Sequence, residues 1–144
     1  MSEQNVADVR ALWEPLEGLN LADIDWDHEA IRGALGAAYS PDVELTTLAS
    51  GIGSGVDLFY EGAEGFARYL REWMEPFSEY RVENLDYIEA GDCVLVPSRQ
   101  WGIGKASGAR VELELTTLFE LRDGLITRVH QFDTLAEARE AAGA

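Results

Sequence analysis

The sequence predicts an α+β domain in which helices cover one face of a curved antiparallel sheet. Two observations support this class. Apolar residues recur with helical spacing through much of the first half, whereas the second half alternates apolar and polar residues between short turns. The chain has 144 residues, of which 47% are hydrophobic, and this is enough for one domain with its own core. We therefore expect residues 1–144 to form a single domain.

Two helices are expected before the first strand. Apolar residues follow the helical period over residues 6–16, where Pro15 is expected to bend or end the helix. A second helix follows Asp25 and Asp27, either of which can cap its N-terminus. This helix is expected to end before Pro41.

The middle of the chain contains a strand, a loop and the clearest amphipathic helix. The segment "VELTTLA" (43–49) is rich in β-branched residues and predicts a strand. Glycine and serine dominate "SGIGSGVD" (50–57), which predicts a mobile loop. Over residues 61–77, apolar side chains recur every three or four positions and predict a helix with one buried face.

After residue 77 the sequence predicts four antiparallel strands and a short final helix. The strands correspond to "YRVENLDYIE", "CVLVPSRQW", "ARVELELTTLFEL" and "LITRVHQF". Glycine-containing turns separate them, including Arg122-Asp123-Gly124. Thr134 and Glu137 have the spacing of a capping box, which predicts the start of the final helix. The predicted order of elements is ααβαββββα.

Composition excludes several classes of function. The net charge is −16, and the eleven lysines and arginines are scattered, so binding to nucleic acid or to an anionic membrane surface is not expected. No apolar run approaches the ~20 residues that span a bilayer. The N-terminus lacks the pattern of a signal peptide, and Cys93 is the only cysteine, so we expect a reducing, cytoplasmic location.

No metal or cofactor site is expected. The two histidines, His28 and His130, do not form a metal-ligand spacing with the carboxylates, and one cysteine cannot build a cysteine-based zinc site. The glycines of "GIGSG" do not follow a strand and open a helix, as a dinucleotide-binding loop requires.

Four motifs in this order resemble one known family. They are "YSPDVEL" where the second helix closes into the first strand, "YEGAEGFARYLREW" in the third helix, "FELRDGLITRV" in the late hairpin and "EAREAAG" in the last helix. Together they are similar to the nuclear transport factor 2-like superfamily, and within it to SnoaL-like (polyketide-cyclase-like, ketosteroid-isomerase-like) domains, over residues 6–143. The resemblance implies a cone-shaped α+β barrel, an apolar cavity inside the cone and commonly a homodimer formed through the outer sheet face. It does not fix the function, because the family includes isomerases, cyclases, dehydratases and many non-enzymatic proteins.

The positions that carry catalysis in the family are changed in this chain. Alignment with the steroid isomerases places Thr47 at the catalytic aspartate, and Trp13 and Thr117 at the two groups of the oxyanion hole. Gln131 falls near the aspartate that the polyketide cyclases use on the last strand. Threonine and glutamine do not act as bases near neutral pH, so the ordinary reactions of both groups are not expected.

Strand alternation indicates which remaining side chains face the cavity. Thr117 belongs to the apolar set of its strand, and Gln131 and Asp133 share the inward set of the last strand. Arg99 and Trp101 share a face of their own strand, where the arginine either holds a ligand oxygen anion or pairs with an acidic residue.

Four aromatic residues near the third helix and the end of the second are candidates for the cavity wall: Tyr39, Tyr60, Tyr69 and Trp73. Core packing is the alternative role for each of them, since aromatic residues line both cores and ligand cavities.

Two functions remain open on the sequence alone. The first is a cofactor-free isomerase, cyclase or dehydratase that acts on a hydrophobic carbonyl or polyketide-like molecule, with Asp133 as the catalytic acid or base. Its hydrogen-bond partners would include Gln131 and Thr117. The second is a non-catalytic, dimeric domain that binds a small hydrophobic molecule. The loops at 50–60 and 102–109 are expected to form the mouth of the cavity.

Overall fold

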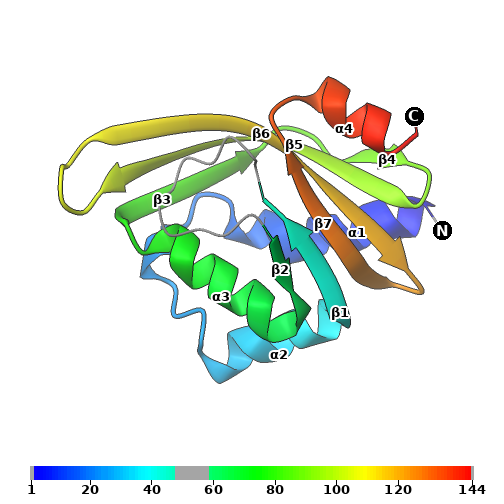
Figure 1. The fold of residues 1–144 in the computed structure, drawn as a ribbon, viewed down its shortest axis with the longest axis horizontal. Helices are drawn as coiled ribbons and strands as arrows, with labels where there is room; N and C mark the ends of the chain where they lie inside the picture. The colour runs from blue at the N-terminus through cyan, green and yellow to red at the C-terminus, as the bar shows by residue number, and fades with distance from the viewer. Residues whose placement is uncertain (1, 48–58, 144) are drawn as a thin grey trace.

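A computed structural model of the chain describes residues 2–47 and 59–143, and the predicted loop at 50–57 lies outside these ranges. In the described part, a curved sheet that does not close on itself arches over α2 and α3, and α4 lies on the opposite side of the sheet (Figure 1). The predicted α+β class is confirmed. No helix within the described ranges is long and apolar enough to span a bilayer.

Helices occupy the N-terminal third. They are α1 (Ser2–Trp13), the short 3-10 helices η1 (Glu14–Leu16) and η2 (Leu21–Asp23), and α2 (Glu29–Ala38). Pro15 lies in η1, directly after the end of α1, because proline suits the first turn of a helix and not its interior. The N-terminal cap of α2 is His28, whose Nδ1 accepts the backbone N–H of Ala30 at 3.1 Å, and not Asp25 or Asp27.

The sheet contains seven strands in the described residues. They are β1 (Tyr39–Thr46), β2 (Phe59–Glu61), β3 (Phe77–Asn84), β4 (Ile88–Ala90), β5 (Cys93–Gly104), β6 (Arg110–Arg122) and β7 (Leu125–Phe132). Their order is β2-β1-β7-β6-β5-β3, with β4 paired to β5. The helix α3 (Gly62–Met74) precedes β3, and α4 (Leu135–Ala141) follows β7. The sheet is mixed: β1 runs parallel to β7, whereas the pairs β1–β2 and β6–β7 are antiparallel.

The hairpin of β6 and β7 has the predicted turn and an irregular register. Asp123 and Gly124 both have positive φ, at 54° and 80°, as a two-residue hairpin turn of this hand requires. A bulge between the pairs Glu120–Arg128 and Leu121–Ile126 reverses the alternation locally. Ile126 therefore lies in the main core, although simple alternation along β7 places it on the outer face.

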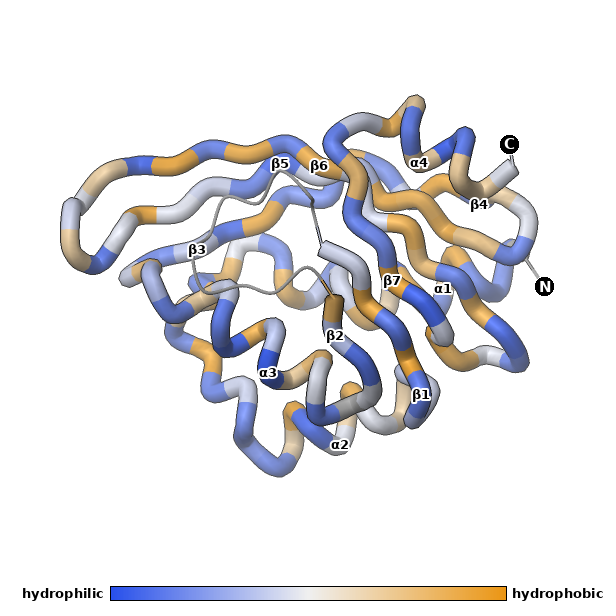
Figure 2. Tube along the Cα trace, viewed as in Figure 1, coloured by the Kyte–Doolittle hydropathy of each residue, from blue (hydrophilic) through white to orange (hydrophobic). Residues whose placement is uncertain are grey.

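Two hydrophobic clusters stabilise the fold. The larger one fills the space between the helices and the inner face of the sheet. The smaller one lies on the outer face, where α4 covers Leu95 and Leu118, and both of these side chains are fully buried. The alternation of hydrophilic and hydrophobic residues along β6 and β7 is visible in Figure 2.

Candidate functional site

A cavity of about 100 Å³ lies between the inner face of the sheet, α3 and the segment that joins α1 to α2. Seven aromatic residues contribute to its wall: Trp13, Trp26, Phe66, Tyr69, Trp73, Tyr80 and Phe119. Eight aliphatic residues complete the apolar lining: Leu16, Leu21, Leu45, Leu70, Met74, Val82, Val96 and Val129. The polar members of the lining are Glu17, Asn84, Ser98, Gln100, Thr117 and Gln131.

The aromatic wall comes mainly from one face of α3 and from β3. Phe66, Tyr69 and Trp73 are three and four residues apart, so they lie on the same side of the helix. The rings of Tyr69 and Trp73 have centroids 5.7 Å apart, and Trp73 meets Tyr80 edge-on at 6.3 Å. These separations are favourable for aromatic pairs, so the wall is held in place by its own ring contacts.

The ring of Tyr80 packs against β5 at a glycine, Gly102, which leaves room for it. A Cβ atom at Gly102 would lie 2.7 Å from Cδ1 of Phe77 and 2.8 Å from Cδ2 of Tyr80. Glycine is therefore the residue that lets both rings pack against β5, and Tyr80 reaches the cavity because of it.

Tyr69 carries a hydroxyl group that can still donate a hydrogen bond. Nε2 of Gln131 donates to this hydroxyl at 2.6 Å. Among the described residues, the O–H of Tyr69 itself donates no hydrogen bond. Burial raises the pKa of Tyr69 far above its ordinary value of 10, so the group is a neutral phenol at any physiological pH. The cavity thus contains a hydroxyl group whose oxygen accepts a hydrogen bond from Gln131 and whose hydrogen can be donated to a ligand.

A second polar group is satisfied internally. The hydroxyl of Tyr80 donates to Oε1 of Gln100 at 2.6 Å, and Nε2 of Gln100 donates to Oγ of Ser98 at 3.0 Å. Oγ of Ser98 in turn donates to the backbone carbonyl of Leu115 at 3.4 Å. The hydroxyl hydrogens of Tyr80 and Ser98 therefore both have acceptors, and these residues form a fixed polar strip along the cavity. The hydroxyl of Tyr69 is more available than theirs to donate a hydrogen bond to a ligand.

Glu17 is the only charged residue among the described residues that line the cavity. It is half-buried, and its Oε1 accepts the backbone N–H of Asn84 at 2.9 Å. No group of three or more histidine, cysteine, aspartate or glutamate residues in the described ranges could hold a metal ion.

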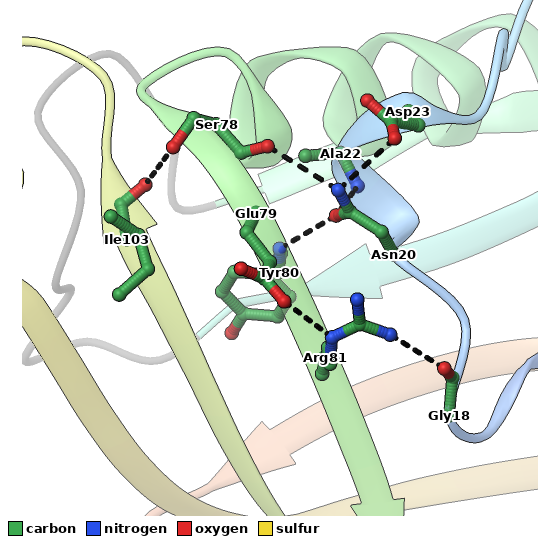
Figure 3. Close-up of polar contacts among 9 residues, drawn as sticks. All are labelled: Gly18, Asn20, Ala22, Asp23, Ser78, Glu79, Tyr80, Arg81 and Ile103. Carbon is green, nitrogen blue, oxygen red and sulfur yellow. Dashed lines mark hydrogen bonds and ion pairs between the residues drawn. The ribbon is translucent and has the colours of Figure 1, made fainter.

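The loop that carries Glu17 is attached to the edge of the sheet. β3 is an edge strand, so some of its backbone groups have no strand partner. Asn20 replaces that partner: its Oδ1 accepts the N–H of Tyr80 at 2.9 Å, and its Nδ2 donates to the carbonyl of Ser78 at 3.3 Å (Figure 3). The guanidinium of Arg81 donates to the carbonyl of Gly18 at 2.6 Å in the same region. These contacts place the loop against the cavity.

Comparison with known proteins identifies the family. The model of the SnoaL-like domain matches residues 25–129, which is more than half of the chain. The chain belongs to the SnoaL-like domain family. No curated protein matches its sequence.

Solved structures of other proteins share the fold. A candidate SnoaL-like polyketide cyclase from Jannaschia sp. CCS1 has a TM-score of 0.71 and 21% identity, with 99% of this chain and 94% of that chain covered. TerC, co-crystallized with polyporic acid, has a TM-score of 0.69 and 18% identity, with 97% of this chain and 98% of TerC covered. A protein with a ketosteroid isomerase-like fold from Catenulispora acidiphila, in complex with trimethylamine, has a TM-score of 0.62 and 19% identity, with 99% of this chain and 95% of that protein covered. At these identities the likeness concerns the fold.

Five of the site residues expected from the sequence line the cavity of this SnoaL-like domain: Trp13, Tyr69, Trp73, Thr117 and Gln131. They come from the end of α1, from α3, and from neighbouring positions on β6 and β7, where Thr117 is paired with Gln131. The structure therefore brings together residues that are up to 118 positions apart in the chain.

Three other expected residues are buried outside the cavity lining. Tyr39 packs on Phe66 with ring centroids 4.4 Å apart, and its hydroxyl is buried without a hydrogen-bond partner in the described part. The hydroxyl of Tyr60 donates to Oε1 of Glu72 at 2.5 Å. Thr47 is buried just beyond the end of β1. The rings of Tyr39 and Tyr60 pack against Phe66 and Tyr69 of the cavity wall.

Arg99 and Trp101 share a face of β5 as expected, but it is the face opposite Ser98 and Gln100, so neither residue lines the cavity. Of the two roles left open for Arg99, the structure shows pairing with acidic residues. The guanidinium of Arg99 lies 3.8 Å from Glu83 and 3.4 Å from Glu114, and this side chain is more than half exposed. The guanidinium of Arg110 stacks over the ring of Trp101 at 4.3 Å. Both residues therefore belong to the outer surface.

Asp133 also lies away from the cavity. β7 ends at Phe132, so strand alternation no longer fixes the direction of the next side chain, and Asp133 is exposed at the bend before α4. Thr134 caps the final helix as predicted: its Oγ1 accepts the N–H of Glu137 at 3.2 Å and donates to Oε1 of Glu137 at 3.1 Å. The expected inward position of this aspartate is not what the structure shows.

Sequence reasoning missed five cavity residues that β3, β5 and the covering loop contribute: Glu17, Trp26, Asn84, Ser98 and Gln100. Ser98 and Gln100 could have been found from the polar run "SRQ" if the inward face of β5 had been known. Glu17 and Trp26 lie outside regular strands, so no periodicity points to them.

Proposed function

We propose that this SnoaL-like domain binds a small, mainly apolar molecule that carries an acceptor oxygen, such as a cyclic ketone. The observation that carries the proposal is the neutral phenol of Tyr69, which presents a free O–H donor inside an aromatic cavity. A buried donor without an acceptor is costly, and a carbonyl oxygen would satisfy it.

The size of the cavity supports a single-ring ligand. Pockets for drug-sized molecules measure roughly 300–1,000 Å³, whereas an apolar cavity of roughly 150 Å³ can hold benzene. At about 100 Å³, the cavity accommodates a molecule of that class with small adjustments of its wall. A ligand of several fused rings would require one of the large side chains to move.

The charge of the site supports a neutral ligand over an anionic one. Glu17 is the sole charged residue among the described lining residues, and the whole chain carries a net charge of −16. An anionic ligand would lose its hydration without gaining a positive partner in the described lining. A cation remains compatible with the aromatic faces and Glu17, so trimethylamine, which is bound by one protein of similar fold, is a useful second probe.

Tryptophan fluorescence tests the proposal directly. Three of the four tryptophans line the cavity, and Trp101 does not, so W101F removes the signal that does not report on binding. Cyclohexanone is expected to change the remaining fluorescence in a saturable way. Y69F should weaken this binding roughly threefold to tenfold, because it removes one hydrogen bond.

The matched control is Y60F, which removes a phenol that donates to Glu72 and does not line the cavity. Its affinity for cyclohexanone should equal that of the parent protein. Absence of saturable binding by any small ketone, or equal binding by Y69F, would overturn the proposal.

A second candidate function is cofactor-free proton transfer on the bound ketone. The specific observation is that one carboxylate, Glu17, shares the cavity with the phenol donor of Tyr69. The carboxylate would take a proton from the carbon beside the carbonyl, the C–H electrons would form a C=C bond, and the C=O π electrons would move to the oxygen, where the O–H of Tyr69 would stabilise the enolate. In an unsaturated ketone, the protonated carboxylate would return the proton to the far end of the conjugated system, which shifts the C=C bond and completes an isomerisation.

Hydrogen–deuterium exchange separates the two candidates. In D2O, an active protein would accelerate exchange at the α-carbon of cyclohexanone, followed by NMR, and E17Q would abolish the acceleration. E14Q is the control, because Glu14 is an exposed carboxylate outside the cavity lining. Saturable binding with no acceleration over buffer would leave binding as the function.

Assembly as a homodimer is proposed on the family resemblance alone. The subunit mass is 15.9 kDa, so light scattering after size-exclusion chromatography should give about twice that value. A mass equal to that of one subunit would contradict the proposal.

A further inference from the structure

The cavity shares part of its wall with a second hollow on the surface. This outer hollow has a volume of about 180 Å³ and is lined by Ala22, Ile24, Asp25, Trp26, Asp27, Arg71, Met74, Glu75 and Lys105. Trp26 and Met74 line both the outer hollow and the cavity. These two side chains therefore separate the cavity from a recess that is already shaped in the surface.

Trp26 is held by packing and not by hydrogen bonds. The residue is 5% exposed, and its indole Nε1 is buried without a hydrogen-bond partner in the described part of the chain. A swing of this side chain towards the outer hollow breaks no hydrogen bond, and it allows the indole N–H to regain one with water. The large apolar ring is thus a movable part of the wall, in contrast to Tyr80, which is fixed by Gln100.

The backbone on either side of Trp26 is fastened to other elements. We call residues 20–27 the strap. At its beginning, Asn20 bonds to the edge of β3, as Figure 3 shows. At its end, Oδ1 of Asp27 accepts hydrogen bonds from Arg32 of α2 at 3.1 Å and from Arg71 of α3 at 2.7 Å. The strap is therefore held at both ends, with Trp26 directly beside the second fastening.

We propose that Trp26 determines the size of the ligand that the cavity accepts and controls passage from the outer hollow, and that the ion pairs of Asp27 hold it closed. This inference rests on the proposed binding function. It extends that function, because it names the residue that limits ligand size and a route by which a ligand reaches the cavity.

The ion pairs give the closure a measurable dependence on salt. The side chain of Asp27 is 49% exposed, and those of Arg32 and Arg71 are 32% and 44% exposed. Pairs of this exposure are weak and are screened by added salt. The closed position should therefore loosen as the ionic strength rises, without unfolding of the domain.

Variants of Trp26 and of Asp27 test the two parts of the proposal. W26A shortens the shared wall and should join the cavity to the outer hollow, so that the bicyclic ketone 2-tetralone binds at least about tenfold more tightly than to wild type. W26L is the second variant, in case W26A is too unstable to study. D27N keeps Trp26 and removes the charge that pairs with both arginines.

Stopped-flow fluorescence with cyclohexanone measures the closure. D27N should raise both the association and dissociation rates about threefold to tenfold and leave the affinity nearly unchanged. Raising the salt from about 20 mM to about 500 mM should accelerate wild type but not D27N. E75Q is the matched control, because Glu75 lines the same hollow and forms no ion pair in the described part of the chain.

A readout without ligand separates this inference from the proposed function. Acrylamide should quench tryptophan fluorescence more strongly in D27N than in wild type or E75Q, since Trp26 then swings outward more often. Stronger quenching in D27N supports the closure even where no ketone binds. The role of the strap would be overturned if ketones bind but D27N changes neither the rates nor the quenching, and neither Trp26 variant changes the size limit. The proposed binding function would then still stand.

Discussion

Replacement of Asn20 by alanine should destabilise the protein by about 2–4 kcal/mol. The side chain makes four hydrogen bonds: its Oδ1 accepts from the N–H groups of Ala22 and Tyr80, and its Nδ2 donates to Asp23 and to the carbonyl of Ser78. The lost cap of η2 costs ~0.5–2 kcal/mol, and the N–H of Tyr80, which is nearly buried, costs a further ~1–3 kcal/mol when it is left without a partner.

Urea unfolding followed by circular dichroism measures this loss. Q4A is the control, since Gln4 forms one exposed hydrogen bond with Asp8 on α1 and should cost less than about 0.5 kcal/mol. An N20A variant as stable as Q4A would refute the role of Asn20 as the partner of the β3 edge.

Three further predictions concern other parts of the fold. G102A should lower the thermal unfolding temperature, because its Cβ would lie 2.7 Å from a ring atom of Phe77 and overpacking costs ~1–3 kcal/mol. G33A, where no atom lies within 4 Å and the helix is exposed, should raise that temperature, and equal effects of the two changes would contradict the packing argument. Burial and a neighbouring arginine lower the pKa of His130 below 6.5 in the folded protein, so the unfolded state binds more protons as the pH falls. The unfolding free energy should therefore decrease below pH ~6.5, and H130F, compared by urea unfolding at pH ~8 and pH ~5.5, should decrease less. Burial raises the pKa of the Cys93 thiol, so Ellman's reagent should react slowly with the native protein and rapidly in urea; a rapid native reaction would show that the thiol is accessible.

Much of the fold is encoded in local patterns. The spacing in 61–77 predicted α3, Pro15 predicted the end of α1, and the turn at Asp123 predicted the hairpin of β6 and β7. The two shortest strands, β2 and β4, have three residues each, which is too short for any alternation to be recognised. The parallel pairing of β1 with β7 depends on residues about 85 positions apart, and no local signal records it.

Strand alternation predicted only part of the candidate site. It gave the inward position of Thr117 on β6, where one alternating set is the more apolar, and the inward position of Gln131 on β7. On β5 the same reasoning placed Arg99 and Trp101 towards the cavity, because both alternating sets of that strand contain apolar residues. The reason is α4, which covers the outer face where β5 begins and buries Leu95 there. Glu17 and Trp26 reach the cavity through tertiary contacts, and no helical or strand periodicity in the sequence indicates their positions.

The pairing of β1 with β7 also sets the order in which the chain can fold. β1 is made early in synthesis, but of its two neighbours in the sheet only β2 is available soon, and β7 ends at residue 132 of 144. Pairings of such long sequence separation form slowly, since the closure of a long loop precedes any gain from the contact. Leu45 and Val129, which line the cavity, lie directly opposite each other on these two strands. On the ribosome, the wall of the cavity therefore becomes complete only after β7 has emerged.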